Sequence, residues 1–360
     1  MKIVIILGTR PEIIKMAPVI RELGKKQADF FILHTGQHYS YRLDKVFFEQ
    51  LELPQPRHNL DVGSGSHAEA TGKILIGVEK VLQEEIPNII LVEGDTNSTL
   101  AGALAAVKLH IKVGHIEAGL RSHDRNMPEE INRILTDHCS DLLFAPTEKA
   151  KETLLGEGIP EKKISVTGNT IVDAVCQNLE IARKEGNTLD ALNLRAKEYF
   201  MVTLHRQENV DNRARFASIL EGLDRVTAEF ETPVIYPIHP RSRKMMTKFG
   251  LQPRCPMLTE PVDFLSFLQL ESNARLILTD SGGVQEEACI LNVPCVTLRD
   301  NTERPETLEV GANILAGVLP DKIVECSKLM LGRKNNWQNP LGDGTAGRKI
   351  VEIIMRGNNG

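Results

Sequence analysis

The chain has 360 residues, of which 41% are hydrophobic and 25% are charged. This composition is typical of a globular protein and excludes disordered, collagen-like and fibrous chains. The formal net charge of −5 argues against a protein that coats nucleic acid, although a local basic pocket for a small anion fits it. At about 150 residues per domain, the length predicts two domains.

The apolar runs are too short for a membrane helix or for the core of a signal peptide, so we expect a cytoplasmic protein with no membrane partner. The first of them, Ile3–Leu7, is a run of isoleucines, a valine and a leucine. The 6 cysteines are scattered and form no Cys-x-x-Cys pair. We expect them to be reduced and mostly buried, and we expect no metal site.

Short apolar runs alternate with amphipathic stretches along the first half of the chain. After Ile3–Leu7 come the loop Gly8–Glu12 and apolar residues at helical spacing up to Ile20, with Pro11 suited to the first turn of a helix. Further strands are predicted at Phe30–His34, Ile89–Val92, Val113–Ile116 and Leu142–Phe144. Continuous apolar strands separated by helices indicate a parallel sheet that is covered on both faces.

The pattern begins again after Val166–Asn169, which predicts a second domain of the same kind. Strands are predicted at Tyr199–Leu204, Val234–Pro237, Leu276–Thr279 and Cys295–Leu298, and a last amphipathic helix at Thr345–Met355. The chain therefore predicts two doubly wound α/β domains joined near residue 168. Such sheets bind ligands beyond the carboxyl ends of their strands. In a two-domain protein we expect the carboxyl ends of the two sheets to face each other across a cleft.

A turn with two glycines follows the strand Leu276–Thr279 and predicts a phosphate site. Ser281, Gly282 and Gly283 precede a helix whose free N–H groups suit an anion. The turn lacks the lysine of an ATPase loop, and no strand-linked Gly-x-Gly-x-x-Gly pattern for a dinucleotide occurs. The alternative is a tight strand-to-helix connection in which Ser281 caps the helix.

Basic residues follow other strands and are candidates to hold the same anion. The loop Arg299–Glu306 carries two arginines beside carboxylates, and it is either a salt-bridged loop or a clamp for a diphosphate. Arg10 and Lys15, which follow the first strand of the other domain, are candidates for the same ligand.

Three acidic positions lie where strands or helices begin or end in the first domain. Asp95 is either an acid/base group or the cap of the next helix. Glu117 is either an acid/base group or the ion-pair partner of Arg121. Glu129 lies in a first helical turn, where the helix dipole favours acids. Closely placed carboxylates are driven apart in pKa, so one becomes an acid and one a base. His205 and His239 end strands in the other domain and are candidates for proton transfer.

These motifs, in this order, resemble the non-hydrolysing UDP-N-acetylglucosamine 2-epimerases over nearly the whole chain. The matching segments are Gly8–Glu12, Glu93–Thr96, His115–Arg121, Pro128–Glu130, Leu204–Arg206, Asp280–Glu287 and Thr302–Glu306. The resemblance implies the GT-B fold, with Rossmann-like domains at 1–168 and 169–344 facing across a deep cleft. It also implies that the helix within 345–360 packs back on the first domain.

The resemblance also implies roles for particular residues. Asp95, Glu117, Glu129 and His205 match the proposed catalytic positions, and Arg10 and Lys15 match residues that contact phosphate or sugar. Ser281, Gly282 and Gly283 match the diphosphate turn, Glu287 the carboxylate that binds ribose, Phe267 the position beside uracil, and Arg304 another nucleotide contact. The implied reaction interconverts UDP-N-acetylglucosamine and UDP-N-acetylmannosamine through anti elimination of UDP, 2-acetamidoglucal and re-addition, with no cofactor. Domain closure is expected to hold the glucal, and a homodimer is expected.

One segment departs from the family pattern. Several bacterial members have an allosteric substrate site near a Gln-His-x-Gln sequence, whereas Gln37-His38 is followed here by Tyr39-Ser40 and Gly63–His67 occupies a later part of that region. The sequence therefore does not predict allosteric activation. Thr35–Tyr39 also resembles relatives that act on UDP-2,3-diacetamido hexuronic acids. The sequence is compatible, too, with a GT-B glycosyltransferase, a hydrolysing relative or a nucleotide-sugar sensor without activity.

Overall fold

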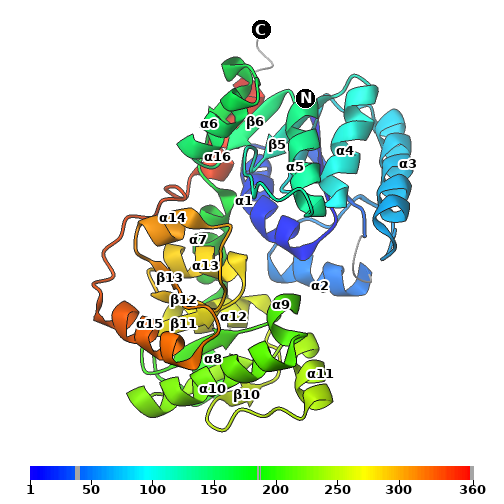
Figure 1. The fold of residues 1–360 in the computed structure, drawn as a ribbon. Helices are drawn as coiled ribbons and strands as arrows, with labels where there is room; N and C mark the ends of the chain where they lie inside the picture. Colours follow the sequence, from blue (N-terminus) through cyan, green and yellow to red (C-terminus); the bar gives the residue numbers. More distant parts are fainter. Residues whose placement is uncertain (37–40, 185, 187, 357–360) are drawn as a thin grey trace. The chain divides into compact units, whose positions relative to one another are not determined.

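The computed structural model describes residues 1–36, 41–184, 186 and 188–356, with residues 41–44 described by their backbone only. The described residues divide into two compact units (Figure 1). The first comprises Met1–Ala174 and Leu341–Gly360, and the second comprises Val175–Pro340. Helix α7, Thr170–Ala182, begins in the first unit and ends in the second.

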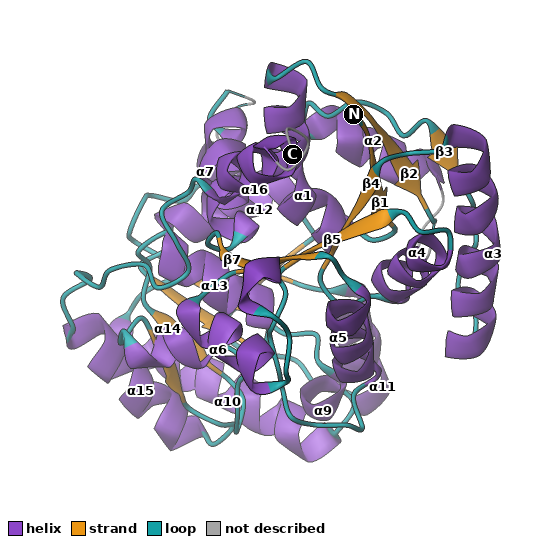
Figure 2. Cartoon of the chain, turned by 90° about the horizontal axis from the view of Figure 1, so that it is seen from above, coloured by secondary structure: helices purple, strands orange, loops and turns teal. Residues whose placement is uncertain are grey.

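The first unit is built on a parallel sheet whose strand order is β3-β2-β1-β4-β5-β6-β7. Its strands are β1 Lys2–Leu7, β2 Asp29–His34, β3 His58–Asn59, β4 Ile89–Glu93, β5 Lys112–Ile116, β6 Leu142–Ala145 and β7 Ile164–Val166. Its helices are α1 Arg10–Lys25, α2 Tyr41–Gln50, α3 His67–Glu85, α4 Asn97–Lys108, α5 Pro128–Cys139, α6 Glu148–Gly156 and α16 Ala346–Arg356, with a 3₁₀ turn at Glu161–Lys163. In Figure 2, α4 and α5 lie on one side of β1, β4 and β5, and α1 and α16 on the other.

The second unit repeats this plan with the parallel order β10-β9-β8-β11-β12-β13. Its strands are β8 Phe200–Thr203, β9 Val234–Pro237, β10 Met257–Thr259, β11 Leu276–Thr279, β12 Cys295–Thr297 and β13 Asn313–Leu315. Its helices are α8 Thr188–Ala191, α9 Gln207–Val210, α10 Arg213–Phe230, α11 Pro240–Phe249, α12 Phe264–Asn273, α13 Gly282–Ile290, α14 Pro305–Glu309 and α15 Pro320–Gly332. Phe200 and Val202 enter one core, whereas Met201 enters the core on the opposite face. Burial on both faces explains the continuous apolar runs.

The predicted doubly wound sheets are confirmed in both units, and the predicted central strands lie within a residue or two of the observed ones. The strands β3, β7, β10 and β13 were not predicted from the sequence. Each of them lies at an edge of its sheet and is partly exposed, so no continuous apolar run marks it. Among the described residues, no helix is long and apolar enough to cross a bilayer.

Helix α16 packs against α1 within the first unit. The backbone of Pro18 lies so close to Gly347 that an added Cβ would be 3.0 Å from its carbonyl carbon. The Asp173 carboxylate accepts hydrogen bonds from the backbone N–H groups of Ala346 and Gly347, at 3.1 and 3.0 Å. A carboxylate on the first N–H groups of a helix is favoured by the helix dipole, so Asp173 holds the returning chain.

The cysteines are only partly as predicted. All 6 are free, but Cys176 and Cys255 are exposed and Cys139 is half-buried, which contradicts the prediction that most are buried. The other cysteines are buried, and burial raises the pKa of the Cys289 thiol to about 12.

Candidate active site

The loops that carry the predicted acidic residues follow neighbouring strands of the first sheet. Strands β1, β4 and β5 run parallel and in register. The loops after Leu7, Glu93 and Ile116 therefore leave the sheet together at its carboxyl edge, the side on which these strands end. Ligands of open parallel sheets bind at this edge.

Glu117 follows β5 directly and is held in an unusual backbone conformation. Its φ is 70°, a left-handed value that is costly for a residue with a side chain and that concentrates at functional sites. Both of its carboxylate oxygens accept hydrogen bonds from Lys15 Nζ, at 2.8 and 2.6 Å. Asn169 Nδ2 donates to the same carboxylate at 3.1 Å. The alternative in which Glu117 pairs with Arg121 is therefore wrong.

Three other residues of the His115–Arg121 segment contact one buried acid, Asp137. Its carboxylate accepts from the backbone N–H of Gly119 at 3.2 Å and from Arg121 Nη2 at 2.7 Å, and it contacts His115 Nδ1 at 2.7 Å. Burial acts to raise the pKa of Asp137, but His115 and Arg121 outweigh it and lower that pKa. These contacts lie on both sides of Glu117 in sequence, so they fix its strained backbone.

Glu93, the last residue of β4, is a site residue that belongs to a family motif but was not predicted as a candidate. Its strand register places it beside Ile116, next to Glu117. Glu93 Oε1 lies 3.2 Å from Lys15 Nζ, and its side chain is 2% exposed. Burial raises the pKa of Glu93 well above its usual value; Lys15 opposes the rise, and the Glu117 carboxylate adds to it. A carboxylate that ends a buried strand is the same signal that singled out Glu117.

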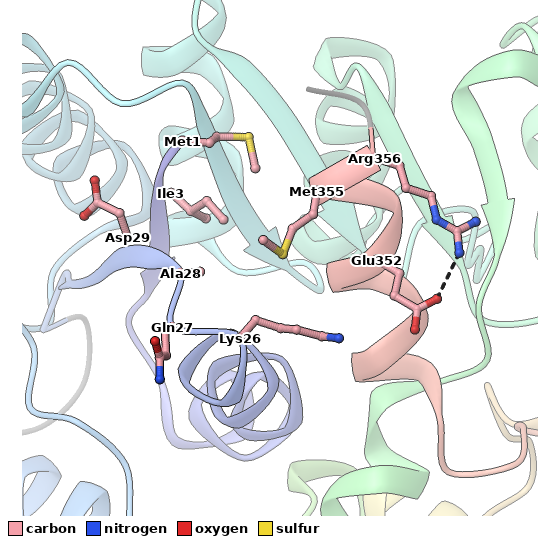
Figure 3. A pocket seen from close by; sticks show the side chains of 9 residues that line it. All are labelled: Met1, Ile3, Lys26, Gln27, Ala28, Asp29, Glu352, Met355 and Arg356. Carbon is pink, nitrogen blue, oxygen red and sulfur yellow. Dashed lines mark hydrogen bonds and ion pairs between the residues drawn. The ribbon is translucent and has the colours of Figure 1, made fainter. Parts of the chain in front are cut away.

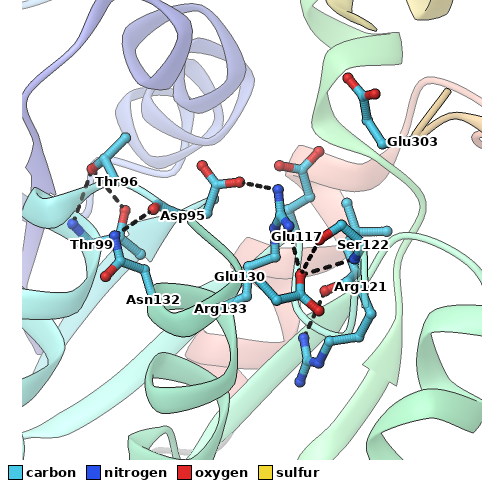
Figure 4. A network of polar contacts seen from close by, with 12 residues as sticks. Asp95, Thr96, Thr99, Glu117, Arg121, Ser122, Glu130, Asn132, Arg133 and Glu303 are labelled. Carbon is cyan, nitrogen blue, oxygen red and sulfur yellow. Dashed lines mark hydrogen bonds and ion pairs between the residues drawn. The ribbon is translucent and has the colours of Figure 1, made fainter. Parts of the chain in front are cut away.

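Asp95 does not cap helix α4, so that alternative is wrong. The cap is Thr96, whose hydroxyl accepts from the N–H groups of Ser98 and Thr99. The Asp95 carboxylate instead accepts from Arg133 Nη2 at 2.6 Å, as Figure 4 shows. Arg133 also donates to Glu130, which lies in the first turn of α5 beside Glu129, as predicted.

A cavity of about 260 Å³ brings Asp95 and Glu129 together. Its other lining includes Thr96, Asn132 and the Gly63–His67 region. Asn132 Nδ2 donates to the Asp95 carbonyl at 2.9 Å, so α5 is tied to the loop that carries Asp95. Residues 37–40, which carry the rest of the region that departs from the family pattern, lie outside the described residues.

In the second unit, the predicted diphosphate turn begins helix α13. The predicted cap is confirmed, because the Ser281 hydroxyl accepts from the Val284 N–H. The helix starts earlier than predicted, since Gly282 and Gly283 belong to its first turn. An added Cβ on Gly282 would overlap the Glu303 carboxylate, so a side chain at this position would require Glu303 to move.

Asp280, which is fully buried, holds the loop that carries His205. Its carboxylate accepts from the backbone N–H groups of His205 and Arg206 at 3.1 Å each and from Asn209 Nδ2 at 3.2 Å. His205 Nδ1 lies 3.4 Å from the same carboxylate. The ring of His239 is 5.6 Å from that of His205, and burial is the main cause that lowers the pKa of both histidines. Burial therefore favours the neutral form of both imidazoles, which is the form that accepts a proton.

The loop after β12 is a network of charges around Glu303. Glu303 pairs with Arg206 Nη2 at 2.6 Å and with Arg299 Nη1 at 2.7 Å. Burial acts to raise the pKa of Glu303, but the two guanidinium groups outweigh it and lower that pKa to about 2. The salt-bridged loop, one of the two structures that the sequence allowed here, is therefore present.

We expect the Glu303→Gln variant to be less stable than the unmodified protein by about 3 kcal/mol at pH 7, because each pKa unit of the lowering corresponds to about 1.4 kcal/mol. Because the folded pKa is depressed, this contribution is complete above about pH 4.5 and is lost as pH falls towards 2. Urea unfolding between pH 7 and pH 3 measures it. Glu260→Gln is the control, since Glu260 pairs with Arg243 but its side chain is 78% exposed. A difference that does not shrink on acidification would contradict this assignment.

The remaining predicted nucleotide contacts lie around helix α13 or on its neighbour α12. Arg304 Nε lies 3.1 Å from Glu286 Oε1 on α13. Glu287, one residue further, lies beside the buried Glu271 of α12, whose pKa is raised well above its usual value by burial and by Glu287. Phe267, also on α12, is partly buried against the core.

In the first unit, Arg10 begins α1, and its guanidinium carbon lies 5.7 Å from the centre of the Phe47 ring.

Another cavity, of about 720 Å³, lies at the amino-terminal ends of β1 and β2 (Figure 3). It is lined by Met1, Ile3, Lys26, Gln27, Ala28, Asp29, Glu352, Met355 and Arg356, a set that includes no predicted site residue.

The sequence profile described as UDP-N-acetylglucosamine 2-epimerase matches residues 21–355. The chain is 57% identical to the UDP-N-acetylglucosamine 2-epimerase of Methanocaldococcus jannaschii, over 99% of this chain and 100% of that protein. The chain belongs to the UDP-N-acetylglucosamine 2-epimerase family. The family named from the motifs is thus confirmed.

Other members of the family extend this comparison. A crystal structure of the M. jannaschii UDP-GlcNAc 2-epimerase in complex with UDP-GlcNAc and UDP matches with a TM-score of 0.89 and 57% identity, over 99% of this chain and 100% of that one. The UDP-2,3-diacetamido-2,3-dideoxy-D-glucuronate 2-epimerase of Pseudomonas aeruginosa is 42% identical, over 99% and 100% of the two chains. The predicted GT-B class, with two Rossmann-like domains, is confirmed.

Within the family's site, the sequence missed residues whose partners are distant along the chain. Asn169 donates to Glu117, 52 residues away, and Asp280 accepts from His205, 75 residues away. Neither contact leaves a periodic signal in the sequence. Among the described residues, no cluster of three or more His, Cys, Asp and Glu side chains is arranged to hold a metal ion.

Proposed function

We propose that the protein is an isomerase that interconverts UDP-N-acetylglucosamine and UDP-N-acetylmannosamine by inverting C2 of the sugar. The observation that supports this most is the strained, buried Glu117 at the carboxyl edge of the first sheet, on the family's own acidic motif. A carboxylate held there by Lys15 and Asn169 is a fixed group for proton transfer.

The proposed reaction requires acid/base groups because the C2 hydrogen is not acidified by a neighbouring carbonyl. We propose anti elimination of UDP to give 2-acetamidoglucal, followed by re-addition of UDP with a proton on the opposite face. Proton removal and return on two faces need at least two positioned groups. We assign these roles to Asp95, Glu117, Glu129 and His205, of which Asp95 and Glu129 line one cavity.

The UDP leaving group needs positive charge and N–H donors that are already in place. We assign the diphosphate to Ser281, Gly282 and Gly283, whose N–H groups begin α13, a position that favours anions. We propose that Glu287 binds the ribose, that Phe267 lies beside uracil, and that Arg304, Arg10 and Lys15 contact the nucleotide or sugar. We propose that the reaction needs no cofactor and that the domains close on the ligand.

The test is to incubate the purified protein with UDP-N-acetylglucosamine and to follow the products by NMR. We expect the manno epimer, and the same final mixture when the reaction starts from UDP-N-acetylmannosamine. Free N-acetylmannosamine with UDP would instead indicate a hydrolase, and sugar transfer to an added acceptor would indicate a glycosyltransferase. UDP binding without any product would indicate a nucleotide-sugar sensor without activity.

UDP-2,3-diacetamido-2,3-dideoxy-glucuronic acid is the second candidate substrate, since a relative named for it is 42% identical. The 57% identity to a relative named for UDP-N-acetylglucosamine favours the first candidate. Comparison of kcat/KM for the two sugars decides between them, and we expect the higher value for UDP-N-acetylglucosamine. We further propose a cytoplasmic homodimer, on the family resemblance alone; light scattering of the purified protein tests the dimer.

We expect the Arg304→Ala variant to bind UDP about 10- to 100-fold more weakly, because a charge-assisted hydrogen bond contributes about 1.5–3 kcal/mol. Calorimetric titration with UDP measures the affinity. Arg225→Ala is the control, since Arg225 forms an exposed ion pair with Asp321 in the same unit. Unchanged UDP affinity in Arg304→Ala would remove Arg304 from the nucleotide site.

A further inference from the structure

The side chains of Lys15, Glu117 and Glu93 meet at the ends of β4 and β5. Lys15 Nζ lies 2.6 Å from Glu117 and 3.2 Å from Glu93. The three side chains are 15%, 7% and 2% exposed, respectively. Among the described residues, Lys15 is the cation within ion-pair distance of Glu93, and its ammonium group donates to both oxygens of Glu117. A second buried carboxyl group beside the same ammonium group ionises only at a large cost. One of the two carboxyl groups therefore carries a proton.

The hydrogen-bond geometry identifies which carboxyl group is protonated. Both oxygens of Glu117 accept hydrogen bonds from Lys15, and Asn169 donates a third. Glu93 Oε1, by contrast, lies near Lys15 but accepts no hydrogen bond from the described residues. Donors stabilise the ionised form of a carboxyl group, so Glu117 is the anion and Glu93 is the neutral acid.

We propose that Glu93 is a positioning residue that carries a proton, donates it in a hydrogen bond to Glu117, and leaves Glu117 as the ionised partner of Lys15. The burial and charge that raise the pKa of Glu93 agree with this assignment. The inference rests on the proposed function of Glu117 as an acid/base group. Glu93, the last residue of β4, thereby controls the proton affinity of the Glu117 carboxylate.

Among the described residues, the charged groups that act on the pKa of Glu93 come from two elements. Helix α1 contributes Lys15 and Glu12, and the loop after β5 contributes Glu117. Glu12 is buried and accepts from Gly8 N–H at 2.9 Å and from the hydroxyl of Thr96 at 2.7 Å. Because Glu12 has its own donors, it is the group from which Glu93 has to be distinguished.

The test compares Glu93→Gln, which keeps a donor but cannot ionise, with Glu93→Met, which has a similar size and no donor. We expect Glu93→Gln to keep kcat within about threefold and to lose the alkaline decline of kcat that the unmodified protein shows when Glu93 ionises. We expect Glu93→Met to shift the acidic limb of kcat/KM upward by about one pH unit, because Glu117 loses a donor that favours its ionised form. The affinity for UDP is expected to stay within twofold in both variants.

Glu12→Gln is the matched control, and we expect it to keep the alkaline decline. Identical pH profiles for all variants, or loss of the decline in Glu12→Gln but not in Glu93→Gln, would overturn the inference. If Glu93→Met does not fold, the alkaline limb of Glu93→Gln still decides. An unmodified protein that shows no epimerisation would overturn the proposed function instead, so the two failures are distinguishable.

Discussion

The Glu117→Gln variant is expected to lose turnover by about 10³-fold while its affinity for UDP stays within about twofold. A positioned acid/base group contributes about 10²–10⁴ to a rate, and glutamine keeps the shape of the side chain without accepting a proton. Most of the residues assigned to the nucleotide lie in the other unit, so their N–H groups and charges are unchanged; they are Phe267, Ser281, Gly282, Gly283, Glu287 and Arg304. Progress curves for epimerisation and calorimetric titration with UDP measure the two quantities separately.

Glu161→Gln is the control for this substitution. Glu161 also pairs with a lysine, Lys151, at 2.7 Å in the first unit, but its side chain is 69% exposed. We expect this variant to turn over at the normal rate. Normal turnover in Glu117→Gln, or loss of UDP affinity without loss of turnover, would remove Glu117 from the chemistry.

The Asp137→Asn variant is expected to lose about 3–5 kcal/mol of stability, the usual cost of removing one member of a buried ion pair. The Asp137 side chain is 0% exposed and that of Arg121 is 2% exposed, so water does not replace the lost charge. Since the backbone N–H of Gly119 also donates to Asp137, we expect the Glu117 loop to relax and kcat to fall. Urea unfolding at pH 7 and kcat measurements check both effects.

Glu157→Gln is the matched control because Glu157 is the other carboxylate that pairs with Arg121, at 2.7 Å. Its side chain is 29% exposed, and we expect a loss below about 1 kcal/mol. The lowered pKa of Asp137 adds a pH dependence: its contribution is complete above about pH 4 and is lost as pH falls through the lower folded value. Equal stability losses in the two variants would contradict the role given to burial.

The central strands were predictable because burial on both faces requires continuous apolar runs. Strands such as β1, with five of its residues fully buried, leave such a run in the sequence, whereas the edge strand β10 is mostly exposed and does not. The turn at Ser281 was also predictable, because a cap and two glycines are local signals.

The candidate site was predictable only in part, because sequence marks positions and not partners. Glu117 stood out as a carboxylate at the end of a buried strand, but its partner Lys15 lies 102 residues away. The sequence offered Arg121, a near neighbour, in place of that distant lysine. Glu93 carried the same signal as Glu117, and only the shared contact with Lys15 shows that the two carboxyl groups lie together.

Solvent exchange at C2 tests the central claim, that side chains of this protein remove a proton from the sugar carbon and return one from solvent. The protein is incubated with UDP-N-acetylglucosamine in heavy water, and both epimers are analysed by NMR and mass spectrometry. We predict a single deuteron at C2 in the manno epimer and, as the reaction approaches equilibrium, in the gluco epimer as well. Formation of the manno epimer with its original hydrogen at C2 would contradict the account.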